Sequence, residues 1–153
     1  MLDPFYRKTK RSGAWADSLR GRSYEIPARK IPKQIPIIVN VCNFSNPSGS
    51  PTLLDMYDVE TLFHEFGHAL HEMLSESQYS DLSGFEVEWD FVELPSQLLE
   101  NWVTERESLS HLGQHFQTGD PLPEDTLDTL EKLSTYMTGY GTLRQCEFAL
   151  LDM

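Results

Sequence analysis

The chain is organised around the stretch Leu62-Phe63-His64-Glu65-Phe66-Gly67-His68-Ala69-Leu70-His71. It contains the pattern His-Glu-x-x-His, which on a helix places His64 and His68 one turn apart on the same face. Two imidazoles so arranged can ligate one Zn²⁺, and Glu65 between them can act as general base towards an attacking water. A lone buried histidine is usually a hydrogen-bonded core residue, whereas a histidine pair with a glutamate between them favours a metal site.

The residues around this pattern predict the helix that carries it. Asp55 followed by Asp58 resembles a capping box, apolar residues then recur at helical spacing, and the sequence turns polar from Ser75. Gly67 in the middle of a helix costs about 1 kcal/mol relative to alanine. Close approach of another backbone or of a substrate would explain this glycine, and a tolerated imperfection is the alternative.

His71 follows at the end of the same stretch. The helical rise places it about 10 Å along the axis from His64. We therefore expect His71 beside the metal ligands or on the surface, and outside the ligand set.

Composition restricts the class of protein. The chain has 153 residues, the length of one domain, and no run approaching the roughly 20 apolar residues of a membrane span. The start of the chain lacks the apolar region of a signal peptide. Cys42 and Cys146 fit a reducing compartment, so we expect a cytoplasmic location and no membrane partner, with an organelle as the alternative if a targeting region is missing.

Charge is distributed unevenly along the chain. Residues 1–33 hold nine of the 12 Lys and Arg residues but only three of the 24 Asp and Glu residues. A basic arm can bind nucleic acid, but aromatic residues are only sparsely interleaved with the basic ones there and no nucleic-acid motif is present, so we expect no such partner. The acidic remainder is either a solvated surface or a cleft that attracts cations and basic peptides.

The region before the histidine helix predicts a small sheet. We expect residues 1–33 to be irregular apart from a strand near Leu2–Tyr6, and Pro27–Pro36 to be an extended connector. The β-branched run Pro36–Phe44 predicts the clearest strand, closed by a turn at Asn46–Gly49. This strand is either part of the core or an edge to which an extended substrate adds.

A second informative stretch, Trp89–Trp102, predicts a helix whose first turn contains Pro95. Glu93, Gln97 and Glu100 form a polar stripe along this otherwise apolar helix. Aligned carboxylates in apolar surroundings need a partner, because an unpaired buried charge costs several kcal/mol. The partner is either a metal ion with its histidines or solvent.

The remaining residues carry less chemistry. His111 and His115 have no glutamate between them and are interpreted as a surface pair. A helix is predicted to begin at 120–123, with a buried face formed by Leu127, Leu130 and Leu133. A last helix is predicted from about Gly141.

Several of these motifs resemble one known family when taken together and in order. The residues His64–His71, Asp90–Gln97 and Glu100–Trp102, with the upstream segments 10–15 and 41–44, look like the thimet oligopeptidase and oligopeptidase A family of zinc peptidases. The resemblance implies a mainly helical α+β fold, a zincin-like catalytic subdomain with a small N-terminal sheet.

The family also implies roles for individual residues. His64, His68 and Glu93 would ligate Zn²⁺, with Glu65 as general base. A second group would surround these ligands: Glu100, which orients a ligand histidine, with Gln97 and His71. The residues expected to line the substrate groove are Val41, Cys42, Asn43, Phe44 and Gly67.

The chain also departs from the family. Members are several hundred residues longer, with an N-terminal helical lobe and a downstream Gly-rich segment whose His and Tyr contact substrate. Residues 1–153 would therefore be part of a catalytic lobe, with short peptides as substrates and the remainder of an oligopeptidase as a partner. Weak or absent turnover by this chain alone is the expectation. A zinc-binding module without catalysis and a helical interaction domain remain as alternatives.

Overall fold

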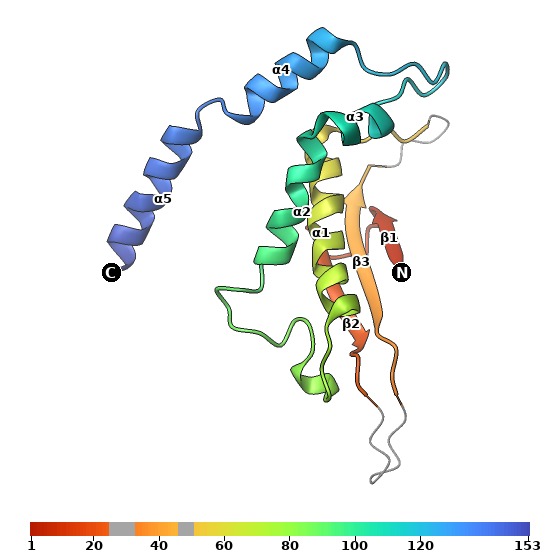
Figure 1. The fold of residues 1–153 in the computed structure, drawn as a ribbon, viewed down its shortest axis with the longest axis vertical. Helices are drawn as coiled ribbons and strands as arrows, with labels where there is room; N and C mark the ends of the chain where they lie inside the picture. The colour runs from red at the N-terminus through yellow and green to blue at the C-terminus, as the bar shows by residue number, and fades with distance from the viewer. Residues whose placement is uncertain (25–32, 46–50) are drawn as a thin grey trace. The chain divides into compact units, whose positions relative to one another are not determined.

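The computed structural model describes residues 1–24, 33–45 and 51–153 and has an α+β fold, as predicted. It divides into two compact units, residues 1–103 and residues 104–153. The first unit contains a three-stranded sheet in the order β1-β3-β2, formed by Leu2–Phe5, Ile37–Phe44 and Trp15–Arg20 (Figure 1). Strand β1 runs parallel to β3, and β2 runs antiparallel to it.

The predicted strand before the histidine helix is β3, and it lies in the middle of the sheet. The interpretation as a core strand is therefore right, and the interpretation as an edge for substrate is wrong, because β1 and β2 flank it. The predicted strand near Leu2–Tyr6 is β1. Strand β2 contradicts the expectation that the rest of residues 1–33 is irregular. The predicted turn Asn46–Gly49 and residues 27–32 of the predicted connector lie outside the described residues.

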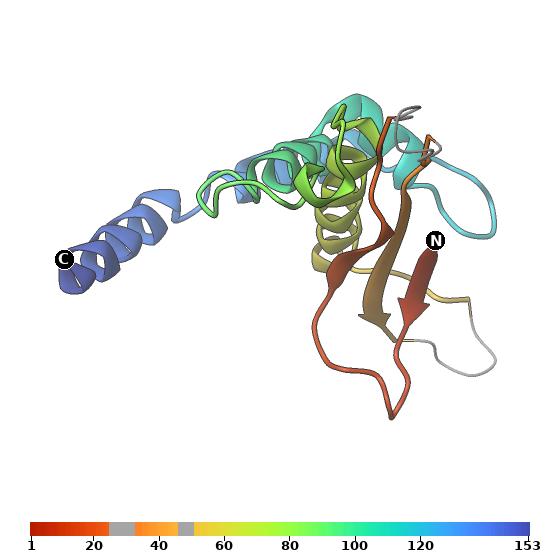
Figure 2. The ribbon, with the colours of Figure 1, turned by 90° about the horizontal axis from the view of Figure 1, so that it is seen from below.

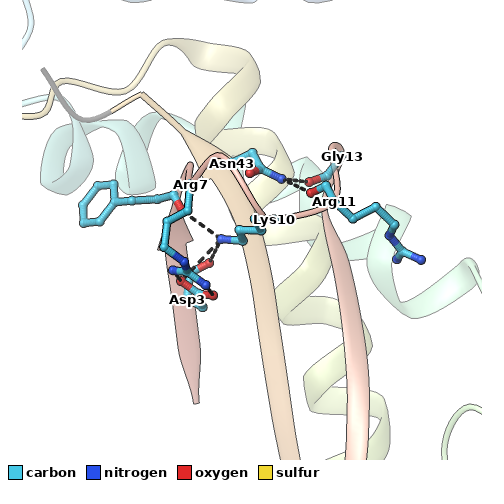
Figure 3. Close-up of polar contacts among 7 residues, drawn as sticks. Asp3, Arg7, Lys10, Arg11, Gly13 and Asn43 are labelled. Carbon is cyan, nitrogen blue, oxygen red and sulfur yellow. Dashed lines mark hydrogen bonds and ion pairs between the residues drawn. The ribbon is translucent and has the colours of Figure 1, made fainter.

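Two basic residues near the start of the chain donate hydrogen bonds to other residues of the first unit. The Arg7 guanidinium donates two hydrogen bonds of 2.6 Å to the Asp3 carboxylate, and Lys10 Nζ donates to the backbone oxygens of Asp3 and Phe5 at 2.9 Å (Figure 3). The hydrogen bonds from Arg7 hold the pKa of Asp3 at about 2. Part of the basic arm thus fixes the chain segment after β1.

Helix α1, Met56–Leu74, is the predicted histidine helix and packs on the sheet (Figures 1 and 2). Its N-cap is Asp55, whose carboxylate accepts the backbone N–H of Asp58 at 2.8 Å, as the sequence indicates. An apolar groove of about 750 Å³ lies where α1 meets β1, β3 and α2.

Helix α2, Leu94–Thr104, begins five residues later than predicted. Residues before it form turns, in which the N–H of Phe91 bonds to Glu88 O and the N–H of Leu94 bonds to Phe91 O. The reason is Pro95: in a helix starting at Trp89 it would lack the N–H that the Phe91 carbonyl requires, and its ring would clash with that carbonyl. Pro95 instead occupies the first turn.

The second unit contains three helices, α3 (Arg106–Leu112), α4 (Glu124–Ser134) and α5 (Thr138–Asp152). Of the predicted buried face of α4, Leu127 is buried but Leu133 is exposed. Helix α5 begins three residues before the predicted start and is exposed along its length. Both His111 and His115 are exposed, as predicted.

No helix in the described parts of the chain is long and apolar enough to cross a membrane.

Candidate metal centre

Helix α1 presents His64 and His68 on one face, as the spacing requires. Their ring centroids lie 4.9 Å apart and the ring planes are nearly perpendicular, at 83°. The Nε2 atoms of His64 and His68 face the same oxygen, Glu93 Oε2, at 3.2 Å and 3.1 Å. Ligand atoms bound tetrahedrally to Zn²⁺ at 2.0–2.1 Å lie about 3.3 Å from one another. The three side chains, whose ligand atoms lie within 4.8 Å of one another, therefore fit a metal ion of that kind.

Glu93 reaches the histidines from the residue just before α2. Its backbone oxygen accepts the N–H of Gln97 at 3.0 Å, the first hydrogen bond of that helix. Ser96 is fully buried. Its hydroxyl lies 2.8 Å from Glu93 Oε2 and 2.9 Å from the Glu93 backbone oxygen, and it can donate its proton to either. Ser96 therefore helps to orient the carboxylate. The sequence contains one indication of this role, because Ser96 lies three residues after Glu93 in the first turn of the helix.

Glu100 lies on the other side of His64. Its Oε1 is 2.5 Å from His64 Nδ1. A carboxylate in that position accepts the Nδ1 proton, which leaves Nε2 of His64 as the free lone pair that faces Glu93. The stripe of Glu93 and Glu100 therefore contacts both nitrogens of one imidazole.

His68 is held differently. Its Nδ1 is buried and has no hydrogen-bond partner among the described residues, and its ring makes an edge contact with Phe85 at a centroid distance of 6.1 Å. Burial lowers the pKa of His68, while the Glu93 carboxylate acts in the opposite direction. The lowered pKa favours the neutral imidazole, the form that ligates metals.

Glu65 lies between the histidines in sequence and is only 5% exposed. Its Oε2 has no hydrogen-bond partner within the described ranges. Burial raises the pKa of Glu65, with His64 opposing and the Glu93 carboxylate adding to the increase. Glu65 and His64 line a cavity of about 400 Å³ beside the cluster, together with Ala14, Tyr57, Glu60, Thr61 and Glu100.

Gly67 allows α1 to approach the start of α2. A Cβ added to Gly67 would lie 2.6 Å from the backbone oxygen of Pro95 and 2.6 Å from Ser96 Cα. Of the two explanations that the sequence offered, close approach of another backbone therefore applies. The predicted contact of Gly67 with substrate stays a prediction.

Asn43 secures the segment that precedes β2. Its Nδ2 donates hydrogen bonds to the backbone oxygens of Arg11 and Gly13, at 2.8 Å and 2.7 Å (Figure 3). The next residue, Ala14, lines the cavity beside Glu65. The neighbouring residues predicted for the substrate groove, Val41, Cys42 and Phe44, are buried in β3.

Two residues predicted to lie near the ligands are not members of the cluster of His64, His68 and Glu93. His71 is half-buried, and its ring lies 6.0 Å from that of Phe91. Gln97 is exposed. Their roles beside a metal stay predictions.

The sequence analysis did not identify Glu72, Ser83 or Phe85. Glu72 is 1% exposed and accepts hydrogen bonds from the loop that carries Phe85. The sequence contains one indication that Glu72 lies near the cluster: it is four residues after His68, and therefore one turn further along the same face of α1.

This geometry defines a candidate His₂Glu metal centre formed by helix α1 and the residue that precedes helix α2 in an α+β unit. The chain belongs to Peptidase family M3, whose sequence model matches residues 1–153. It is 43% identical over 155 residues to oligopeptidase A of Haemophilus influenzae. It is 41% identical to the probable cytosolic oligopeptidase A of Arabidopsis thaliana, and 40% identical to the organellar (chloroplastic/mitochondrial) oligopeptidase A of that plant, each over 155 residues.

Each of these comparisons covers 99% of this chain. The resemblance to the oligopeptidase A family is thereby confirmed. The chain spans about a fifth of the length of the curated relatives that it matches, 20–22%.

Proposed function

We propose that this chain carries the zinc-binding and proton-transfer site of a metallo-oligopeptidase that hydrolyses short peptides, and that its first unit is a zincin-like catalytic subdomain. The observation that carries the proposal is the convergence of His64, His68 and Glu93 within 4.8 Å, with the buried Glu65 beside them. Membership of Peptidase family M3 supports the reaction class.

His64, His68 and Glu93 would hold the ion. When bound, Zn²⁺ supplies a Lewis acid that polarises a peptide carbonyl and makes water more acidic. The chain's own residues supply orientation: Glu100 fixes the tautomer of His64, and Ser96 restrains the carboxylate of Glu93.

Glu65 would move the proton. Its Oε2 has no hydrogen-bond partner within the described ranges, and its side chain lines the cavity beside His64, where Glu65 would accept a proton from the attacking water and then pass it to the leaving amine. The raised pKa of Glu65 supports this role, because a general base works best when its pKa approaches the operating pH.

A second candidate function is a zinc-binding segment that hydrolyses peptides only within a longer oligopeptidase polypeptide. Its support is that the chain spans about a fifth of its relatives and exposes large aromatic side chains in the first unit, Trp89 at 90% and Trp102 at 47%. The partner would be the remainder of such a polypeptide. A cytoplasmic location is the proposal, and the relatives named cytosolic and organellar keep an organelle as its alternative.

Metal analysis and a peptidase assay test these proposals in order. Protein purified without a histidine tag should bind one Zn²⁺, and His64→Ala should lose both metal and stability, since binding energy is also folding energy. Absence of stoichiometric zinc, also after titration, would leave a helical interaction domain as the remaining interpretation. Peptide hydrolysis by wild type but not by Glu65→Gln supports catalysis by this chain, and equal turnover by both proteins would refute it. A wild type that binds zinc without turnover supports the second candidate.

A further inference from the structure

The C-terminal end of α1 is connected to the loop 83–85 by a buried carboxylate. Glu72 Oε1 accepts the hydroxyl proton of Ser83 at 2.8 Å, and Glu72 Oε2 accepts the backbone N–H of Phe85 at 3.3 Å. The N–H of Gly84 donates to Ser75 Oγ at 3.1 Å. Three hydrogen bonds thus fix three successive loop residues to the end of one helix.

The loop passes so close to Glu72 that a side chain would not fit at Gly84. A Cβ there would lie 1.8 Å from Glu72 Oε2 and 2.7 Å from Glu72 Cα, and the φ of Gly84 is +40°, a conformation that other residues rarely adopt. Ser83 and Glu72 are both almost fully buried, at 2% and 1% exposure. A buried carboxylate without partners would cost several kcal/mol, so these hydrogen bonds also keep Glu72 in place.

This connection fixes Phe85 next to one of the two ligand histidines. The planes of the Phe85 and His68 rings meet at 71° with the centroids 6.1 Å apart, the edge-on arrangement that aromatic pairs prefer. Ligand histidines are normally oriented by a hydrogen bond from the second ring nitrogen. His64 has that bond, to Glu100, whereas His68 Nδ1 has no partner in the described residues. Packing against Phe85 therefore adds a restraint on the His68 ring to the contact that its Nε2 makes with Glu93.

We propose that Glu72 is a positioning residue for the metal centre: by fixing Ser83–Phe85 against α1, it places the Phe85 ring so that His68 is held in its ligating orientation. The inference rests on the proposed zinc site, but it concerns residues outside the proposed ligand set. It assigns a role to a buried carboxylate that the proposed peptide hydrolysis does not use.

The test combines a metal-free measurement with a metal titration on the full chain. In metal-free wild type, NMR should detect close contact between the ring protons of Phe85 and His68. Glu72→Ala should abolish that contact. Glu72→Gln should preserve it, because an amide can still accept from Phe85 and donate to Ser83. Glu86→Gln, which alters an exposed carboxylate directly after Phe85, is the matched control.

Zinc affinity, from competition with a chelator, and the visible absorption of bound Co²⁺ then report the ligand geometry. Phe85→Ala and Glu72→Ala should weaken zinc binding about 10–100-fold and alter the Co²⁺ spectrum, whereas Glu72→Gln and Glu86→Gln should stay close to wild type. Phe85→Ala leaves Glu72 and its hydrogen bonds intact, so it decides the matter if Glu72→Ala does not fold.

Wild-type zinc affinity and an unchanged Co²⁺ spectrum in folded Phe85→Ala would overturn the positioning role while the proposed function stands. A wild type that binds no zinc would overturn both.

Discussion

Replacement of Gly67 by alanine tests whether the close packing of α1 on α2 sets the position of Glu93, the proposed third metal ligand. The new Cβ would lie 2.6 Å from Pro95 O and from Ser96 Cα, and both contacts are with backbone. Restoring an ordinary contact of 3.4 Å requires a displacement of about 0.8 Å at the start of α2. Glu93 lies two residues before Pro95, so the displacement moves its carboxylate relative to the histidines. Metal–ligand distances tolerate only about 0.2 Å.

The two effects of Gly67→Ala on stability partly cancel. Alanine favours the helix by about 1 kcal/mol, whereas overpacking costs about 1–3 kcal/mol, so we expect a loss of about 0–2 kcal/mol in the free energy of unfolding. Zinc affinity should nevertheless fall at least about 10-fold, because the third ligand is displaced.

Urea unfolding of the metal-free chain and chelator competition measure the two quantities separately. Gly141→Ala is the matched control: Gly141 is also helical, but an added Cβ meets no atom within 4 Å, so alanine should stabilise α5 and leave zinc affinity unchanged. The reasoning is refuted if Gly67→Ala keeps wild-type zinc affinity and gains the full helical stabilisation.

Further predictions concern other residues. Glu100→Gln should weaken zinc binding about 10-fold in chelator competition, since the neutral amide is a poorer acceptor for His64 Nδ1–H. Ser96→Ala, which removes a partly buried hydrogen bond to Glu93, should cost about 1 kcal/mol in urea unfolding of the metal-free chain. Burial raises the pKa of Cys42 to about 11, so at pH 8 a thiol reagent should modify only the exposed Cys146, and Cys146→Ser should leave no fast-reacting thiol. Because the unfolded thiol ionises near 9.0, the contribution of Cys42 to stability should be present below pH 9 and lost between about pH 9 and 11, a loss absent in Cys42→Ala. Arg106→Ala, which removes ion pairs from α3 to three carboxylates of α4, should accelerate amide hydrogen exchange in α4, by less at 1 M salt than at low salt.

The elements that the sequence predicted well have strong local patterns. Strand β3 is a dense run of β-branched residues, and α1 combines helical apolar spacing with an acidic N-cap at Asp55. Strand β2 lacks such a pattern, since Trp15–Arg20 mixes small, charged and apolar residues. It becomes a strand by pairing with β3, about 20 residues away in sequence, and such a non-local partner is not visible in a local window.

The start of α2 could have been placed better from the sequence. Pro95 was interpreted as tolerated in a first turn, which is correct, but the helix was then extended back to Trp89. The geometry of proline excludes that extension, because a proline tolerated in the first turn leaves room for only a few residues before it.

The assignment of the carboxylates shows why the candidate site was only partly predictable. Spacing placed Glu93 and Glu100 on one stripe without choosing between them, and the family resemblance nominated Glu93 as the ligand. In the structure both contact His64, Glu93 at Nε2 and Glu100 at Nδ1. Which carboxylate faces the Nε2 atoms of both histidines depends on the approach of α2 to α1 at Gly67, a property of tertiary packing.

The same reasoning explains why the two histidines, which are equivalent in the pattern His-Glu-x-x-His, are not equivalent in the structure. His64 faces α2 and takes its orientation from the charge of Glu100, whereas His68 lies closer to the loop 83–85 and packs against Phe85. A helical repeat specifies the direction of each side chain from its own helix, but it contains no information on the neighbour in that direction. The contact of His64 with Glu100 and the packing of His68 against Phe85 therefore follow from what covers α1 on either side, and Glu72 connects the loop that carries Phe85 to α1 itself.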